Sequence, residues 1–254
     1  MKESPVNNKI PVRLRKEPLI EAVWEVRFTS EKQNVADLLP GLIYQAIPGR
    51  YPNIVRLPVA DIPAPIVERD PNLRYVPKIR LEGGSQAIQI GEHVLSLSCR
   101  RPYSGWAGFS ADIRNLISVG RETGLINHID RFSLKYIDLI QLLQPPDLSV
   151  LNIDLKLGGH PVAKQPVQLR TEIIEKGLIH IIQVVSPAEV SLPGEAASSG
   201  GVLLDIDTIA SFKEDGSWGN VEKRLDVAHS ASKKIFFDLL TTETIARLEP
   251  EYPE

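Results

Sequence analysis

Strand patterns follow one another in this chain with only short turns between them, and this succession constrains the fold more than any other feature. Three strand candidates lie within residues 74–100 and four within residues 149–212, separated by glycine turns such as Gly83-Gly84 and Lys176-Gly177. Strands joined by short turns pair antiparallel, whereas parallel strands need long crossover connections. The sequence therefore predicts an α+β fold with mainly antiparallel sheets.

We expect two modules, each a mainly antiparallel sheet with one or two helices packed on one face. Residues 1–17 are predicted to be a mobile, slightly basic arm, and the boundary between the modules lies at Pro145-Pro146. The N-terminal module thus spans 18–145, and 146–254 should form a four-stranded sheet with a long helix. Apolar residues at helical spacing predict helices in 31–47, 103–124, 220–241 and 241–249.

Several local signals refine this expectation. Asn34 is a candidate N-cap of the first helix, and Pro40 should kink or restart it. In the second helix, Ser110 is a candidate cap and Gly120 a candidate end. Seven prolines within 48–77 favour an extended, edge-like segment without a helix. The small polar residues of 186–201 predict an exposed, mobile loop.

Composition favours a cytoplasmic protein. The formal net charge is −3, so nucleic acid is not an expected partner. The N-terminus has no apolar signal-peptide core, and no run approaches the length of a membrane span. The single cysteine, Cys99, excludes an intrachain disulfide and fits a reducing compartment.

The most informative strand is PLIEAVWEVRF, residues 18–28, whose polar face carries Glu21, Glu25 and Arg27. The two glutamates are about 13 Å apart along a strand, too far for a usual glycosidase pair. The strand around 130–139 offers Arg131 and Lys135 as neighbours of opposite charge. We predict a structural ladder of ion pairs, with a polar binding surface and catalysis as the alternatives.

Other polar residues offer weaker candidates. Asp205 and Asp207 share a strand face and could serve a ligand site or an enzyme, together with His229, although a lysine-paired face is the simpler interpretation. No metal-binding spacing of histidine and cysteine occurs. Arg100 and Arg101, close to the YSGWAGF segment, are where an acidic partner or a nucleic acid would be expected.

These residues resemble a sporadically distributed family of uncharacterised bacterial proteins of about this length. Its members open with a proline, an apolar residue, Glu-Ala and an alternating strand that ends in Arg-Phe, as residues 18–28 do. The resemblance continues through Gln86–Ile90, Tyr103–Phe109, the strand around Arg131, residues 203–207 and His229–Phe236. Asp138 departs from it, because the resemblance leads us to expect asparagine there.

The resemblance carries no catalytic residues to this chain. It implies an accessory protein in a bacterial defence, CRISPR-associated or toxin–antitoxin neighbourhood. The main hypothesis is therefore a non-enzymatic, cytoplasmic protein without a cofactor or metal, which binds another protein encoded nearby. A small-ligand-binding protein or an enzyme using Asp205 and Asp207 is the alternative, and a nucleic-acid accessory protein is the third. Homo-oligomerisation stays open.

The expected interaction surface consists of seven charged residues, namely Glu21, Glu25, Arg27, Arg100, Arg101, Arg131 and Lys135.

Overall fold

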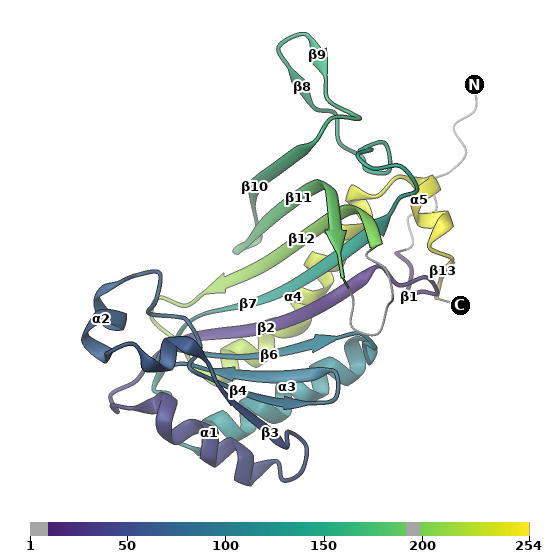
Figure 1. The fold of residues 1–254 in the computed structure, drawn as a ribbon. Helices are drawn as coiled ribbons and strands as arrows, with labels where there is room; N and C mark the ends of the chain where they lie inside the picture. The colour runs from purple at the N-terminus through teal and green to yellow at the C-terminus, as the bar shows by residue number, and fades with distance from the viewer. Residues whose placement is uncertain (1–9, 192–198, 254) are drawn as a thin grey trace.

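A computed structural model describes residues 10–191 and 199–253 of the chain (Figure 1). The α+β prediction is confirmed: one large antiparallel sheet has a few helices packed against it. The helices are α1 (Val35–Ala46), η1 (Pro58–Asp61, a 3₁₀ turn), α2 (Ala64–Arg69), α3 (Gly105–Glu122), α4 (Trp218–Leu239) and α5 (Thr242–Arg247).

Nine strands form the large sheet, in the order β10-β11-β12-β7-β2-β6-β5-β4-β3, and every neighbouring pair is antiparallel. In chain order these strands are β2 (Leu19–Thr29), β3 (Asn53–Arg56), β4 (Ile79–Gly83), β5 (Gln86–Ile90), β6 (Val94–Arg100), β7 (His128–Gln141), β10 (Val167–Glu175), β11 (Leu178–Val190) and β12 (Ser199–Ser211). Two small hairpins complete the fold, made by β1 (Arg13–Leu14) with β13 (Pro250–Glu251) and by β8 (Lys156–Leu157) with β9 (His160–Pro161).

The helices α1, α3 and α4 all lie on one face of the sheet, which we call the covered face (Figure 1). The alternation of the strands directs their apolar side chains there: Trp24, Val26 and Phe28 of β2 are fully buried. They pack with Phe109 and Leu225, which come from the helices, in the main core. The opposite side, which we call the open face, has no helix of this group on it.

The sheet continues across the expected module boundary. β12 pairs with β7 over eleven residue pairs, from Gly201 opposite Gln141 to Ser211 opposite Arg131. The expectation of a separate sheet in each half is therefore wrong, because the last three strands extend the sheet that the first half begins. The main core also combines both halves, since Phe132 and Val221 belong to the same buried cluster.

The helices that the sequence predicts are present, with different ends. In α3 the predicted stripe of Phe109, Ile113, Leu116 and Ile117 is buried. The helix nevertheless begins at Gly105, five residues before Ser110, and runs past Gly120. The YSGWAGF segment thus contains the first turn of the helix, which begins at the third residue of the segment.

The start of α1 is stabilised by a residue distant in sequence. Asn34 is the N-cap residue, as predicted, but it has left-handed backbone angles and its side chain makes no cap hydrogen bond. Instead, the Glu92 carboxylate accepts hydrogen bonds from the backbone N–H groups of Val35 at 2.9 Å and Ala36 at 3.3 Å. The helix runs through Pro40 as a single element.

The proline-rich segment is only partly extended. It supplies the short edge strand β3, as expected, but Pro58 and Pro65 stand in the first turns of η1 and α2. Proline fits there because the first helical N–H groups have no partner within the helix. The prediction that this segment contains no helix is therefore wrong.

The predicted mobile regions are more structured where the structure describes them. Residues 1–9 lie outside the described part of the chain, but Arg13 and Leu14 pair with Glu251 and Pro250. Of the loop expected at 186–201, residues 192–198 are not described, while β11 extends to Val190 and β12 begins at Ser199. The strand expected at 149–158 is reduced to Lys156–Leu157.

Candidate functional site

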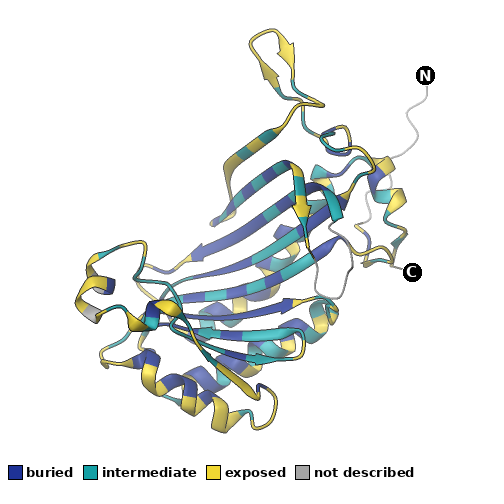
Figure 2. Cartoon of the chain, viewed as in Figure 1, coloured by how far each residue is buried: buried dark blue, intermediate teal, exposed yellow. Residues whose placement is uncertain are grey.

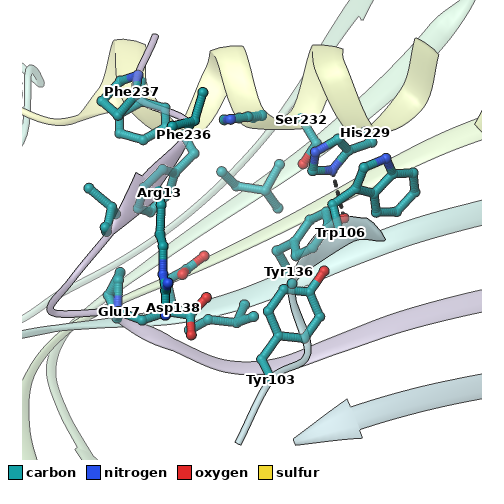
Figure 3. Close-up of a pocket in the computed structure, with 18 of the residues that line it drawn as sticks. Arg13, Glu17, Tyr103, Trp106, Tyr136, Asp138, His229, Ser232, Phe236 and Phe237 are labelled. Atoms are coloured by element: carbon teal, nitrogen blue, oxygen red, sulfur yellow. Dashed lines mark hydrogen bonds between the residues drawn. The ribbon is translucent and has the colours of Figure 1, made fainter. Parts of the chain in front are cut away.

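A cavity of about 480 Å³ opens on the covered face, beside the end of the core. Its walls come from the chain around β1 and the start of β2, from the first turn of α3, from β7 and from α4 (Figure 3). Its polar lining includes Glu17, Tyr103, Tyr136, Asp138 and His229. We call this cavity the Asp138 pocket.

Strand alternation places Tyr136 and Asp138 in the pocket. Phe132 and Leu134 occupy the same face of β7 and are fully buried in the main core. Tyr136 and Asp138 continue this inward-facing row, because every second residue of a strand points to the same face. Tyr136 and Asp138 therefore place a phenol and a carboxyl group on the face of β7 that otherwise carries apolar side chains.

His229 is held by two contacts from opposite sides. Its Nδ1 lies 2.9 Å from the Tyr136 hydroxyl, and its ring stacks on Trp106 with the ring centroids 4.0 Å apart and the planes 5° apart (Figure 3). Trp106 is fixed in turn, since its Nε1–H donates to Asp226 at 3.1 Å. The side chains of α3, β7 and α4 thus form one rigid wall.

Burial keeps the Tyr136–His229 pair uncharged. It lowers the pKa of His229 to about 4, with Lys233 contributing, and it raises the pKa of Tyr136 well above the ordinary value. At neutral pH the ring is neutral and the phenol keeps its proton. The two neutral side chains can therefore form a hydrogen bond with each other or with a ligand, and Tyr136 is not an activated phenolate.

Asp138 is the most perturbed acid of the pocket. Its side chain is buried, and burial raises the pKa of its carboxyl to about 8, with the nearby Glu17 adding to the rise and Arg101 opposing it. Within the described residues the carboxyl makes no hydrogen bond or ion pair. At neutral pH it is mostly protonated and faces a cavity.

The surroundings of Asp138 contain charged groups of both signs. Burial raises the pKa of Glu17, which Arg101 and Arg13 oppose, and burial lowers the pKa of Lys233. The Arg101 guanidinium donates to the backbone oxygens of Leu19 at 2.6 Å and Glu17 at 3.1 Å, so it holds the chain that forms the wall. Figure 3 shows Arg13, Glu17 and Asp138 on one side of the pocket, with Phe236 and Phe237 near Arg13, and the rings of Tyr103, Tyr136, Trp106 and His229 on the other side.

Most of the predicted interaction residues lie elsewhere, on the open face. β2 and β7 are neighbours as expected, with Glu25 opposite Ser133 and Arg27 opposite Arg131. Glu25 forms an ion pair with Arg27 at 2.9 Å and lies 3.7 Å from Arg131, one of the two expected neighbours. Glu21 pairs with Arg100 at 3.4 Å. The ladder of charges is therefore present, and its role as an interaction surface stays a prediction.

Lys135 pairs with a different strand from the one expected. Its ammonium lies 3.4 Å from Asp205, to which Gln183 also donates at 3.3 Å. Asp205 and Asp207 share the open face, whereas His229 lies in the Asp138 pocket on the covered face. The structure thus separates the histidine from the aspartates with which it was grouped.

Three further polar residues, Arg101, Cys99 and His180, make contacts within the fold. Arg101 leaves the ladder to bind backbone oxygens, while the thiol of Cys99 is buried and free of disulfide bonds. His180 is buried in a hydrogen bond of 2.9 Å with Thr208. In the described ranges, no cluster of three or more acidic, histidine or cysteine side chains could hold a metal ion.

The sequence contained one usable signal for the pocket. Asp138 continues the apolar row of β7 in strict alternation, and a carboxyl at a core position is unusual enough to mark a site. The other walls lie far away in sequence, near residues 11–19, 103–106 and 229–237. No spacing rule connects them.

The comparisons with known proteins add no identification. No protein-family model matches the chain, and no curated protein matches it. The family resemblance therefore stays a prediction. Among the described residues, no helix combines the length and the apolar character needed to cross a membrane.

Proposed function

We propose that the protein binds a small organic molecule with a cationic nitrogen in the Asp138 pocket. The observation that carries the proposal is a buried carboxyl group that has no hydrogen bond or ion pair with the described residues and faces a cavity of about 480 Å³. Ligand pockets have volumes of roughly this size, with apolar and aromatic walls and a few polar groups. A bound ammonium, amidinium or guanidinium group would give Asp138 its missing partner.

The polar end of the pocket favours a cation over an anion. Glu17 and Asp138 are neighbours there, and each has a raised pKa although Arg13 and Arg101 are close. Lys233 also lines the pocket, but its long side chain can extend its charge to water, which the short Asp138 side chain cannot do. The start of α3 favours an anion by only about 0.5 kcal/mol.

The aromatic end suits the body of such a ligand. Tyr103, Trp106 and Tyr136 line the cavity there, and their faces can attract a flat ring or a cation. We therefore expect an aromatic or short aliphatic amine, amidine or guanidine. Catalysis is not required by this arrangement.

Binding should depend on pH because a cation binds ionised Asp138. The pKa of this carboxyl is about 8, so a cationic ligand must displace its proton at neutral pH. We expect affinity to rise about tenfold per pH unit from about pH 6 to about pH 8 and to level off above that. An anion would show the opposite trend, with proton uptake on binding.

Three probes of equal shape test the charge of the ligand: benzamidine, benzamide and benzoate. Ligand-detected NMR titrations should give the tightest binding for benzamidine. Asp138→Asn should weaken it about tenfold or more and remove its pH dependence. Asp154→Asn, which alters an exposed carboxylate paired with Lys156, is the matched control. Preferred binding of benzoate, or equal benzamidine binding by wild type and Asp138→Asn, would contradict the proposal.

A second proposal concerns a protein partner on the open face. Three atoms there are buried and have no hydrogen-bond partner within the described residues, namely Asp205 Oδ1, Asp207 Oδ1 and Arg131 Nε. Such groups are costly unless something satisfies them. Mixing with the product of an adjacent gene should give one complex in size-exclusion chromatography, weakened by Asp207→Ala. Separate elution with every neighbouring gene product would count against this proposal.

A further inference from the structure

The two edges of the large sheet differ in their protection. β3 ends the sheet on one side, has four residues, and stands between Pro52 and Pro58. Such short, proline-flanked edges resist pairing with another strand. β10 ends the sheet on the other side, has nine residues and contains no proline. Figure 1 shows it at the outer margin of the sheet, beyond β11.

The turn that follows β10 determines which of its backbone groups point outward. Lys176 and Gly177 form a two-residue turn with φ angles of 50° and 75°, between the paired residues Glu175 and Leu178. In such a hairpin the residues beside the turn bond to each other, and the bonding residues alternate from there. The N–H and C=O groups of Gln168, Arg170, Glu172 and Ile174 therefore point away from β11.

No other described segment satisfies these outward groups. The backbone hydrogen bonds outside the regular strands include none from these four residues to another part of the described chain. Two apolar side chains are exposed on the same strand, with Ile173 44% and Ile174 75% accessible. Figure 2 shows the strand mostly in the colours of exposed and intermediate residues. An exposed strand of this kind is a template for another strand.

We propose that β10 pairs antiparallel with β10 of a second copy, around a twofold axis at Thr171. In this register Arg170 lies opposite Glu172 of the partner subunit, and by symmetry Glu172 lies opposite Arg170 of the partner subunit. Leu169 lies opposite Ile173 of the partner subunit. Both charged pairs are therefore of opposite sign, and they form between outward-pointing residues, as a new hydrogen-bonded ladder requires.

Neighbouring registers are less favourable. Moving the axis to Arg170 or to Glu172 places two like charges directly opposite each other, which destabilises a cross-strand pair by about as much as opposite charges stabilise it. Arg170 and Glu172 already contact within one strand at 3.0 Å, with both side chains about half exposed. The dimer would extend this pair into a square of four charges that alternate in sign around it.

The proposal goes beyond ligand binding, because β10 lies at the far edge of the sheet from β2 and shares no residue with the Asp138 pocket. It also gives the β8–β9 hairpin a neighbour. This hairpin precedes β10 and projects past it in Figure 1. In the proposed register, it would stand beside the Lys176–Gly177 turn of the second copy.

Sedimentation over a range of protein concentrations tests the proposal with the full chain. Wild type should approach twice the chain mass of 28.2 kDa as concentration rises. Arg170→Glu alone and Glu172→Arg alone should both remain monomeric, because each places like charges opposite each other. An equal mixture of the two variants should recover the dimer, since opposite charges then meet at both positions.

Two further measurements keep the result clear. The double variant R170E/E172R should dimerise like wild type, and far-ultraviolet circular dichroism should match for all forms, which excludes misfolding as the cause. Glu172→Pro should abolish the dimer while leaving the β10–β11 ladder intact, because the N–H that it removes points outward. A monomeric wild type at all concentrations, or dimers of both single charge variants, would overturn the proposal.

Discussion

The two faces of the large sheet treat their charged groups in opposite ways. On the open face, carboxylates have cationic neighbours, as Glu25 has Arg27 and Asp205 has Lys135. On the covered face, the Asp138 carboxyl is buried and forms no ion pair within the described residues, and burial raises its pKa to about 8 although Arg101 opposes the rise. A carboxylate in an ion pair is already compensated by the protein itself and needs no external partner. A buried carboxyl without an ion pair costs stability, and such a group is a candidate for a ligand contact.

The largest expected effect tests whether the two faces differ in packing. Trp24→Ala removes a fully buried ring from the covered face and should lower the free energy of unfolding by about 3–5 kcal/mol. Val23→Ala changes the neighbouring residue, which points to the open face, and should cost less than about 1 kcal/mol. Urea unfolding of both variants measures the difference. Equal losses would show that the open face is also a packed core.

The next effect tests the cost of the unpaired carboxyl. Because the pKa of Asp138 is about 8 when folded and ordinary when unfolded, the folded state holds an extra proton between these values. Its stability therefore falls as pH rises from about 4 to about 8. Asp138→Asn should remove this loss and gain about 2–4 kcal/mol at about pH 9, with little change near pH 4.

Denaturant unfolding across this pH range checks the prediction. The expected gain in the free energy of unfolding is smaller than the whole pKa difference would give, because the carboxyl borders a cavity that water can enter. Glu25→Gln on the open face is the matched control, and it should lose a few tenths of a kcal/mol with its ion pairs. An Asp138→Asn variant whose stability falls with pH as steeply as wild type would show that another group titrates.

The smallest effect concerns the ion pairs themselves. Lys135→Met leaves the Asp205 carboxylate, whose pKa burial already raises, without its cation, and should cost about 1 kcal/mol at neutral pH. Lys156→Met breaks a pair in which both side chains are mostly exposed, so thermal unfolding should barely change. A larger loss of stability for Lys156→Met than for Lys135→Met would show that the exposed ion pair contributes more than the partly buried one.

Much of the fold was predictable from local patterns. Alternation in 18–28 and 128–141 predicted neighbouring strands, and the charges on Glu25 and Arg131 correctly indicated that these strands face each other. Helical spacing predicted α3 and α4. The continuity of the sheet from β7 to β12 was missed, because pairing between strands 60 residues or more apart depends on register, which alternation does not encode.

The pocket was less predictable than the sheet. YSGWAGF, His229 and Asp138 each stand out in the sequence, but no pattern in it groups them. YSGWAGF lies close to Arg100 and Arg101, His229 was a candidate partner of Asp205 and Asp207, and Asp138 departs from the family pattern. Their chemistry depends on being together, since the stacking of Trp106 on His229 and the burial of Asp138 exist only after α3 and α4 dock on β7.

The hairpin of β1 with β13 makes one wall of the pocket depend on residues near the C-terminal end of the described chain. Arg15 and Glu251, which bond at 2.8 Å, are 236 residues apart, and the segment 11–14 that forms one wall of the pocket is held by this contact. Because this hairpin needs residues 250–251, it can form only after the ribosome has released them. A chain without residues 250–251 would lack the hairpin that holds this wall of the pocket.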